Sequence, residues 1–387
     1  MCQILGMNAR TPTDFQFSFK GFTQRGGATD VHADGWGCCV YKGRGIQAFH
    51  EMAPSCTSPL ASLLQTLPIK THNIIAHIRY ATVGNTTLEN VHPFTRELWG
   101  RNWAFAHNGD LPHFASQTNG RPILGRCSAP SSSPPPPPTI ARLSPKTLHN
   151  TTCAQRHFNP VGTTDSEAVF VEILNAIEQK FCIENGMPSS CELFEFLKSL
   201  TDEIIEGGKE HAKGLGEKEA DYQPIFNFLL CCGEGLQFAF CYPGKRPNST
   251  TWNSLHYIVR RHPFKKASLK DVDYDINFKD VTDPNDQVCI ITTKPLTVDE
   301  CWIEMKKDEL LMFEYGQPFG KKCCKLKEEE EERTGLDGGG SWDIGDVEEV
   351  DRTCGRIEFD SPKRKEKLRE ISRGSIEPLQ LNDVGGR

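Results

Sequence analysis

The stretch NWAFAHNGD, residues 102–110, decides the fold that this chain is expected to adopt. Its first part, residues 102–107, is a short apolar run, and a polar HNGD follows it directly. Similar runs occur further towards the N-terminus, as CQILGMNA at 2–9, WGCCVY at 36–41 and NIIAHIRY at 73–80. Short apolar runs of this kind beside glycine are typical of buried strands, so the first third of the chain is predicted to be rich in them.

Helical patterns follow these strands. Residues 58–67 (SPLASLLQTL) have a Ser-Pro start and helical spacing. A longer helix is predicted to begin at Asp165 or Ser166 and run through AVFVEILNAIEQKF, and another covers about 190–206. Further strands are predicted at 225–232, 236–242, 255–260, 287–293 and 309–315. Strands, then a pair of helices, then strands again favour an α+β fold over an alternating βαβ fold.

The bulk composition excludes several classes of function. The chain has 387 residues, 37% of them hydrophobic, and a net charge of -7. A mildly acidic chain is not suited to coating phosphate backbones, so no nucleic-acid partner is expected. No run of 18 apolar residues occurs, and the N-terminus lacks a basic region followed by a long apolar run. We therefore expect no membrane span, no secretory signal and a cytoplasmic location.

The cysteines indicate neither a metal site nor a disulfide scaffold. There are 16, scattered along the chain, and none is spaced as C-x-x-C. The usual zinc and thioredoxin signatures are therefore missing, and no metal or other cofactor is expected. Disulfide scaffolds are normally short secreted chains, so these thiols are expected to be reduced and to act as small hydrophobes.

Two segments depart from the globular pattern. Residues 117–157 contain SAPSSSPPPPP, which predicts a disordered surface insertion, with a docking ligand for an SH3 or WW domain as the alternative. From residue 321 the chain changes to KEEEEER, DGGGS and SPKRKEKLRE, which is typical of a solvated, disordered tail. Cys323 and Cys324 could be acylated there. The folded domain is thus expected to span residues 2–320.

Two motifs could carry acyl-transfer chemistry. Cys2 would become the first residue once Met1 is trimmed, and its α-amine could then act as base for its own thiol. A cysteine at position 2 can equally be incidental. Asn108 and Gly109 could offer a side-chain amide and a backbone N–H to an oxyanion, although Asn-Gly is also a common turn dipeptide.

Two charged residues could bind the ends of a free amino acid. Arg79 comes at the end of an apolar strand, and its guanidinium suits a carboxylate, although a structural salt bridge is an alternative. Asp165 precedes a helix and could bind an ammonium group, or could simply be an N-cap. With Cys2 and Asn108–Gly109, they make the minimum set for recognising an amino acid head group and cleaving its side-chain amide.

On these features the sequence resembles the class II glutamine amidotransferases, and most closely their stand-alone, YafJ-like branch. That branch is related to the amidotransferase subunit of the fungal glutathione-degradation complex and to a γ-glutamyl hydrolase of the ergothioneine pathway. The resemblance covers about 1–116 and 156–320, and its clearest stretches are MCQILGMNA, FKGFTQRGG (19–27), HADGWG (32–37), AHIRYAT (76–82), ENVHPFTRELWGRNWAFAHNGDL (89–111) and PVGTTDSEAVF (160–170).

The resemblance implies a role for each motif residue. Cys2 would be the nucleophile, Asn108 and Gly109 the oxyanion hole, Arg79 the ligand of the α-carboxylate and Asp165 that of the α-amine. Arg25, in the QRGG loop that the family places beside the site, would be a further substrate-binding residue, while His92 would be a wall or a support. The implied fold is the four-layer αββα sandwich of N-terminal-nucleophile hydrolases.

The chain also departs from the family pattern. Between Asn108 and Asp165 there are 165 − 108 = 57 positions, more than in compact members, because the proline-rich segment intervenes. The 387 − 320 = 67 residues after Gly320 do not look like a fused synthase domain. The chain is therefore expected either to hydrolyse its substrate outright or to work with a separate subunit.

Three functions remain open at this point. The first is an enzyme that hydrolyses glutamine or another γ-glutamyl amide, alone or within a γ-glutamyl peptide-degrading complex. The second is a non-catalytic relative that binds a γ-glutamyl metabolite and regulates a partner. The third is a proline-rich adaptor that uses the amidotransferase fold as a scaffold. A small-molecule partner is expected for the first two.

Overall fold

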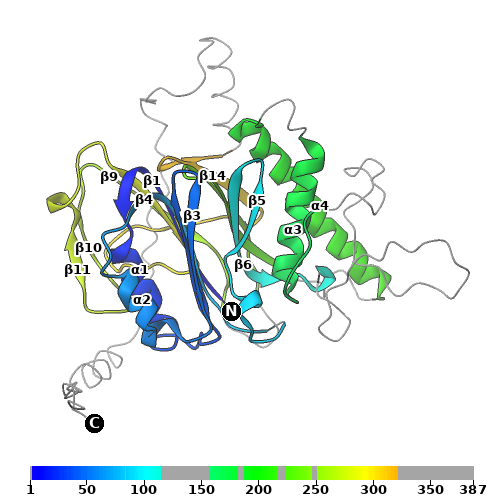
Figure 1. The fold of residues 1–387 in the computed structure, drawn as a ribbon, viewed down its shortest axis with the longest axis horizontal. Coiled ribbons are helices and arrows are strands. Elements are labelled where there is room, and N and C mark those ends of the chain that lie inside the picture. The colour runs from blue at the N-terminus through cyan, green and yellow to red at the C-terminus, as the bar shows by residue number, and fades with distance from the viewer. Residues whose placement is uncertain are drawn as a thin grey trace, which may run out of the picture. The chain divides into compact units, whose positions relative to one another are not determined.

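The computed structural model describes residues 2–82, 84–114, 157–181, 187–216, 224–245 and 251–320 (Figure 1). These residues all belong to one compact unit. The predictions for residues 117–156 and for 321–387, including the docking and acylation alternatives, lie outside the described residues.

The first sheet has seven strands and places the chain's N-terminal strand near its middle. Its strand order is β13-β9-β12-β1-β4-β2-β3, and β1 pairs antiparallel with both β12 and β4. The strands are β1 Gln3–Asp14, β2 Trp36–Lys42, β3 Gly45–Glu51, β4 Lys70–Ile78, β9 His256–Arg261, β12 Gln287–Thr292 and β13 Ile303–Glu304.

The second sheet has six strands, in the order β15-β14-β8-β7-β6-β5. Its strands are β5 Phe94–Leu98, β6 Arg101–Asp110, β7 Ile225–Cys232, β8 Leu236–Tyr242, β14 Glu309–Glu314 and β15 Gln317–Phe319. A separate small ribbon joins β10 Lys266–Ser268 to β11 Asp275–Asn277. The register pairs Asn108 on β6 with Asn227 on β7.

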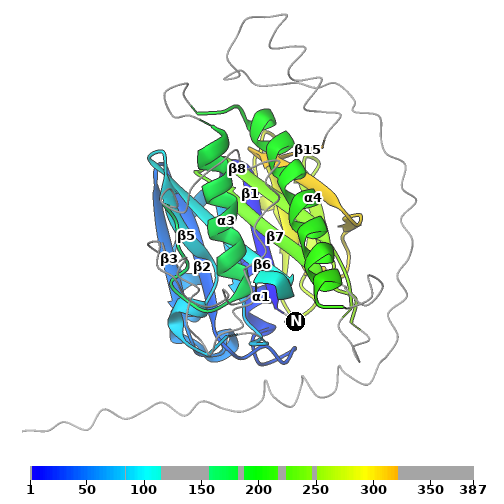
Figure 2. The ribbon, with the colours of Figure 1, turned by 90° about the vertical axis from the view of Figure 1, so that its right-hand side faces the viewer.

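Helices cover the outer faces of the two sheets. The helices α1 Gln16–Gln24 and α2 Pro59–Leu64 lie on the first sheet (Figure 1). The helices α3 Asp165–Lys180 and α4 Ser190–Gly214 lie on the second sheet (Figure 2). A capping box between Ser189 and Glu192 starts α4, which typically stabilises a helix by about 1 kcal/mol. Short 3-10 turns occur at Ser55–Thr57, Leu88–Asn90, Pro112–Phe114 and Phe278–Asp280.

Strand alternation gives each sheet an inner face and an outer face. On β1, Ile4 belongs to the core between the sheets, whereas Leu5 belongs to the core under α1 and α2. On β6, Ala106 faces inwards and Phe105 packs towards α3. The parity of a residue in its strand therefore decides whether its side chain enters the space between the sheets.

The cysteines of the described residues are free thiols. Several pack in the cores, including Cys39 and Cys231 between the sheets and Cys38 under the first pair of helices. Burial raises the pKa of Cys38 and of Cys232 to about 12, so both stay protonated and unreactive at neutral pH.

The α+β expectation is confirmed in its broad form, as a mixed fold of two sheets with few helices. The predicted start of the long helix is confirmed at Asp165. Seven strands and helices of the described residues have no counterpart among the predicted ones, and α4 continues to Gly214 rather than ending near residue 206. These seven are α1, β3, β5, β10, β11, β13 and β15. The edge strand β3 has no buried residue, and it lacks the continuous apolar run that marks the other strands.

Candidate active site

The alternation of side chains along the strands places Cys2, Arg79 and Asn108 on the inner faces of the two sheets, at the same end of both. Cys2 precedes β1 and is two residues from inward-facing Ile4, and Asn108 is two residues from inward-facing Ala106. Arg79 follows β4 and is four residues from Ile75, which also lies between the sheets. Because Gln3 pairs with Ile78 in the sheet, Cys2 and Arg79 are neighbours on adjacent strands.

The Cys2 thiol lies against the backbone of Tyr80. The Tyr80 N–H donates to Cys2 Sγ at 3.4 Å, and the Tyr80 carbonyl oxygen is 3.6 Å from the same sulfur. Cys2 is only half-buried, and Tyr80 is partly exposed and packs edge-on against His32. The sulfur is therefore held in position while remaining open to a small molecule.

Arg79 brings a buried positive charge next to this sulfur. Its side chain is almost fully buried. Burial lowers the pKa of Arg79, and the neighbouring Cys2 and Asp34 offset part of that effect. Asp34 accepts the Ala81 N–H at 2.7 Å and donates its own N–H to the Arg79 carbonyl at 3.2 Å. The HADGWG segment thus supports the end of β4 where Arg79 lies.

Asn108 and Gly109 lie within β6, so the alternative of a simple Asn-Gly turn is wrong. Gly109 pairs with Phe226 across the sheet. A Cβ on Gly109 would lie 1.8 Å from the Ile225 carbonyl oxygen, so any residue other than glycine would clash there. Asn108 and Gly109 therefore lie in the extended strand β6, where the backbone of Gly109 is close to that of β7.

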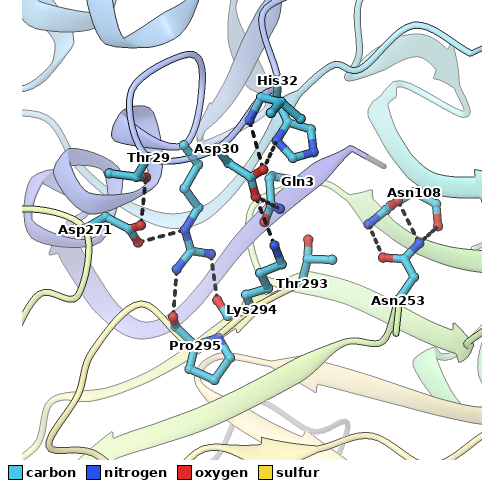
Figure 3. A network of polar contacts seen from close by, with 12 residues as sticks. Gln3, Thr29, Asp30, His32, Asn108, Asn253, Asp271, Thr293, Lys294 and Pro295 are labelled. Atoms are coloured by element: carbon cyan, nitrogen blue, oxygen red, sulfur yellow. Dashed lines mark hydrogen bonds and ion pairs between the residues drawn. The ribbon is translucent and has the colours of Figure 1, made fainter. Parts of the chain in front are cut away.

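The side chain of Asn108 is joined to a second buried amide. Asn108 Nδ2 donates to Asn253 Oδ1 at 2.8 Å, and Asn253 Nδ2 donates back to Asn108 Oδ1 at 2.9 Å (Figure 3). Asn227 Nδ2 donates to the Asn108 carbonyl at 3.2 Å. Neither Asn227 nor Asn253 was predicted as a site residue. Asn227 is a single polar residue within the apolar strand β7, and Asn253 lies in the segment between β8 and β9. Only their contacts in the folded structure connect them with the site.

Asp165 is the first residue of α3, and Thr164 caps that helix, so the N-cap alternative for Asp165 is wrong. Asp165 is buried, and its Oδ2 accepts the Leu111 N–H at 2.9 Å. Leu111 follows directly after the last residue of β6, Asp110. This bond ties the carboxylate of Asp165 to the end of the strand that carries Asn108.

The segment before Asp165 is held in place from within the described residues. The buried carboxylate of Glu167 accepts N–H groups from Val161 at 3.0 Å and Gly162 at 2.6 Å. The Thr163 N–H donates to Asn90 Oδ1 at 2.9 Å. Despite the 165 − 108 = 57 positions between Asn108 and Asp165, the approach to α3 is thus fixed by its own contacts. Glu167 and Asn90 were not predicted from the sequence.

Arg25 is tied to other protein groups rather than to the sulfur. Its Nε donates to Asp271 at 2.8 Å, Nη1 to the Lys294 carbonyl at 2.8 Å and Nη2 to the Pro295 carbonyl at 2.7 Å. Thr29 also donates to Asp271, at 2.8 Å (Figure 3). These contacts correct the expected direct substrate contact to a supporting role, because all three guanidinium nitrogens already serve the protein.

The loop that follows α1 also contacts the start of β1. Asp30 accepts hydrogen bonds from Lys294 Nζ at 2.9 Å and from Gln3 Nε2 at 3.4 Å (Figure 3). Burial raises the pKa of Asp30, but Lys294 and the Val31 N–H outweigh it and leave that pKa below its usual range. A charged Asp30 therefore holds the residue next to Cys2.

His92 lies in a buried histidine pair. Its Nδ1 is 2.9 Å from His77 Nε2, and its ring packs on Phe94. Burial lowers the pKa of both histidines well below the ordinary value, so the pair is neutral. This arrangement agrees with the supporting role expected for His92.

Neither a metal site nor a membrane-spanning helix is present among the described residues. No cluster of three or more histidine, cysteine or acidic side chains there could hold a metal ion. Within the same residues, no helix has both the length and the apolar character needed to cross a bilayer.

The chain belongs to the class II glutamine amidotransferases. The model of that family, "Glutamine amidotransferases class-II", matches residues 1–126 and 146–336. The provisionally named glutamine amidotransferase YafJ of Escherichia coli K12 is 38% identical over 317 residues, which are 82% of this chain and 99% of that protein. A provisionally named glutamine amidotransferase of Haemophilus influenzae is 36% identical over 329 residues, 85% of this chain and 89% of that one. The crystal structure of a predicted glutamine amidotransferase from Pseudomonas aeruginosa PA01 shares 31% identity, covers 83% of this chain and 100% of that chain, and has a TM-score of 0.47.

Proposed function

We propose that this chain is an N-terminal-nucleophile amidohydrolase that cleaves the side-chain amide of glutamine or of a γ-glutamyl compound such as glutathione. The observation that carries the proposal is the shared placement of Cys2, Arg79 and Asn108 at one end of the space between the sheets. The fold would then be the four-layer αββα sandwich of that enzyme class, with residues 2–320 as its single domain.

The proposed reaction has two halves. Removal of Met1 gives Cys2 a free α-amine, which takes the thiol proton as the sulfur bonds to the amide carbon. The carbonyl oxygen becomes an oxyanion that accepts hydrogen bonds from Asn108 Nδ2 and the Gly109 N–H. Collapse of this intermediate breaks the C–N bond, and the leaving nitrogen takes the proton from the α-ammonium. Water then attacks the γ-glutamyl thioester with the α-amine as base, which releases glutamate and restores the thiol.

Arg79 and Asp165 would bind the head group of the substrate. Arg79 is a buried cation next to the sulfur and suits the α-carboxylate. Asp165 Oδ2 accepts the Leu111 N–H at 2.9 Å, and Oδ1 accepts the Ser166 hydroxyl at 3.4 Å. A carboxylate has about four acceptor positions, so it can receive an α-ammonium besides these bonds.

The decisive experiment measures glutamate release by purified protein from glutamine and from glutathione. Wild-type protein should release glutamate, and intact-mass analysis should show that Met1 is absent. Cys2→Ala should release none while keeping its unfolding transition. A wild-type rate in Cys2→Ala would contradict the nucleophile, and binding without any turnover by wild type would favour the non-catalytic alternative.

We also propose that the proline-rich insertion does not contribute to this chemistry. The residues on its two sides are held by the core: Phe114 is buried, and Phe158 exchanges two hydrogen bonds with the Asn175 amide, at 3.1 and 3.0 Å. Replacing residues 119–154 by a short Gly/Ser linker should therefore leave the rate of glutamate release and the melting temperature unchanged. Loss of either would assign the segment a role in the domain. The ammonia would either be released outright or pass to a separate partner subunit, and release of glutamate by the purified chain alone would favour outright hydrolysis.

A further inference from the structure

Asn253 makes a two-way contact with the side chain that is proposed to bind the oxyanion. The two amides exchange hydrogen bonds of 2.8 and 2.9 Å, as Figure 3 shows. Asn253 lies 145 positions from Asn108 in the chain, in the segment between β8 and β9. Both side chains are at most 1% exposed. Water therefore cannot easily replace either hydrogen bond.

The backbone of Asn253 is fixed independently of this amide pair. Its N–H donates to the Gly244 carbonyl at 3.1 Å. Its carbonyl accepts Asn227 Nδ2 at 3.3 Å, and the same Nδ2 lies 3.2 Å from the Asn108 carbonyl. Asn227 therefore links the backbones of the two paired residues, so their amides meet in a constrained geometry.

The exchange of hydrogen bonds decides which way the Asn108 amide faces. The Nδ2 group has two hydrogens, and the pair uses one, which leaves the other for a ligand. Rotating the amide by half a turn would set donor against donor and acceptor against acceptor in the pair. It would also turn the Asn108 carbonyl oxygen, an acceptor, to where Nδ2 had been. An oxyanion would be repelled by that oxygen.

We propose that Asn253 is a positioning residue that holds Asn108 Nδ2 towards the developing oxyanion. This inference rests on the proposed function, because it concerns the same site. Asn253 acts through Asn108 and contacts no reacting atom itself. Its effect should therefore appear in kcat and should vanish when Asn108 has no amide.

The first test is the kinetics of Asn253→Ala with glutamine as substrate. Loss of one oxyanion donor typically lowers kcat by about 10²–10³-fold. In Asn253→Ala the Asn108 amide can rotate freely and faces the oxyanion only part of the time, so kcat should fall by about 10–100-fold. KM should change little, because the head group contacts of Arg79 and Asp165 remain. A wild-type kcat in Asn253→Ala would overturn the inference.

The second test is a double-mutant cycle of Asn108→Ala with Asn253→Ala. If Asn253 works only through the Asn108 amide, its removal should lower kcat by less than about threefold when Asn108→Ala is already present. A general loosening of the fold would instead lower kcat by the same factor in both backgrounds, and that result would overturn the inference. Asn73→Ala is the matched control, because Asn73 is a fully buried asparagine whose amide bonds to the Gly233 and Leu236 carbonyls and to the Cys231 thiol rather than to Asn108. It should lower stability and leave kcat unchanged in the folded protein.

The third test uses Asn253→Asp, which keeps the size of the side chain if Asn253→Ala does not fold. An ionised carboxylate can accept from Asn108 Nδ2 but cannot donate to Asn108 Oδ1. A protonated carboxyl can do both. The ratio of the variant's kcat to that of wild type should therefore rise as the pH falls, and a ratio that stays constant with pH would contradict the inference.

The same measurements separate this inference from the proposed function. If Cys2→Ala and Asn108→Ala keep the wild-type rate, the proposed function is wrong and the positioning role falls with it. If both lose activity while Asn253→Ala keeps the wild-type kcat, only the positioning role is wrong.

Discussion

The carboxylate of Glu167, in the first turn of α3, accepts a hydrogen bond of 2.6 Å from the guanidinium of Arg96 on β5. The Glu167 side chain is 2% exposed and that of Arg96 is 20% exposed. The other carboxylate oxygen of Glu167 accepts the Val161 and Gly162 N–H groups. One buried acid therefore joins the second sheet, the loop before α3 and the helix that begins with Asp165.

The first prediction concerns Glu167→Gln, which keeps the shape of this acid and removes its charge. One oxygen becomes an NH₂ group that must face either Arg96 or the two backbone N–H groups, so donors oppose donors. We expect a loss of about 2–4 kcal/mol in the free energy of unfolding, measured with urea. A lower kcat/KM for glutamine should accompany it, because the Asp165 loop loses its anchor.

A surface ion pair provides the control for this change. Lys198 pairs with Asp202 and Asp308 on the surface, where the side chains are 25–54% exposed. Lys198→Met should lower the free energy of unfolding by no more than about 1 kcal/mol and leave kcat/KM unchanged. Equal effects of the two substitutions would show that Glu167 has no special role in anchoring the loop.

A second prediction concerns Gly109→Ala. The added Cβ would lie 1.8 Å from the Ile225 carbonyl oxygen, so β6 or β7 must shift. We expect a loss of about 2 kcal/mol or more in stability and at least a tenfold loss in kcat, since the shift moves the Asn108 amide. Gly207→Ala on α4, where a Cβ meets nothing within 4 Å, should instead stabilise the protein by up to about 1 kcal/mol. A wild-type kcat in Gly109→Ala would remove Gly109 from the oxyanion site.

Much of this fold follows from local sequence patterns. The apolar runs of β1, β4, β6, β7 and β12 mark buried strands, because each strand is covered on both faces and needs apolar residues at most of its positions. Short motifs were also enough to identify Cys2, Asn108 and Arg79 as candidate site residues. Parity within each strand explains why these residues enter the same space.

The supporting contacts could not be predicted in the same way. Asn253 lies 145 positions from Asn108, and Arg25 lies 246 positions from Asp271. No local pattern shows which partner a polar side chain will meet over such separations. The expectation that Arg25 contacts substrate rests on the family resemblance, which places its loop beside the site but does not show its three protein acceptors.

A third prediction concerns the pH dependence of stability. Burial, and to a lesser extent the nearby His211, lowers the pKa of His113 to about 4, whereas an unfolded histidine has a pKa of about 6.5. Between these values the unfolded chain binds a proton that the folded chain does not. The contribution is therefore fully present above about pH 6.5, and stability falls as the pH drops towards 4, by up to about 1.4 kcal/mol per pH unit for this residue.

Urea unfolding between pH 7.5 and pH 5 measures this slope. His113→Gln should have a shallower fall in the free energy of unfolding than wild type, because one proton uptake is removed. Parallel slopes for wild type and His113→Gln would mean that His113 is not kept neutral by the fold.

The last prediction concerns which part of the substrate the enzyme recognises. Arg79 and Asp165 are the charged residues assigned to the substrate, and they match the α-carboxylate and the α-ammonium of a free glutamyl end. Glutamine and γ-glutamyl amides should therefore be cleaved, while N-acetylglutamine should be cleaved with a kcat/KM at least about 100-fold lower, since Asp165 would be left facing a neutral amide. Arg79→Lys should also lose much of the activity, because an ammonium does not reproduce the two-pronged contact of a guanidinium with a carboxylate.

The deciding measurement is the ratio of kcat/KM for glutamine to that for N-acetylglutamine, taken for wild type and for Asp165→Asn. Asp165→Asn removes the charge that discriminates between the two substrates, so its ratio should fall towards one, mainly through a loss on glutamine. The bond from the Leu111 N–H can persist in this variant, because the asparagine keeps a carbonyl oxygen to accept it. An unchanged ratio would place Asp165 outside the substrate site and leave its contact with Leu111 as its function. A ratio near one already in wild type would contradict recognition of the free α-amine, even if Cys2 proves to be the nucleophile.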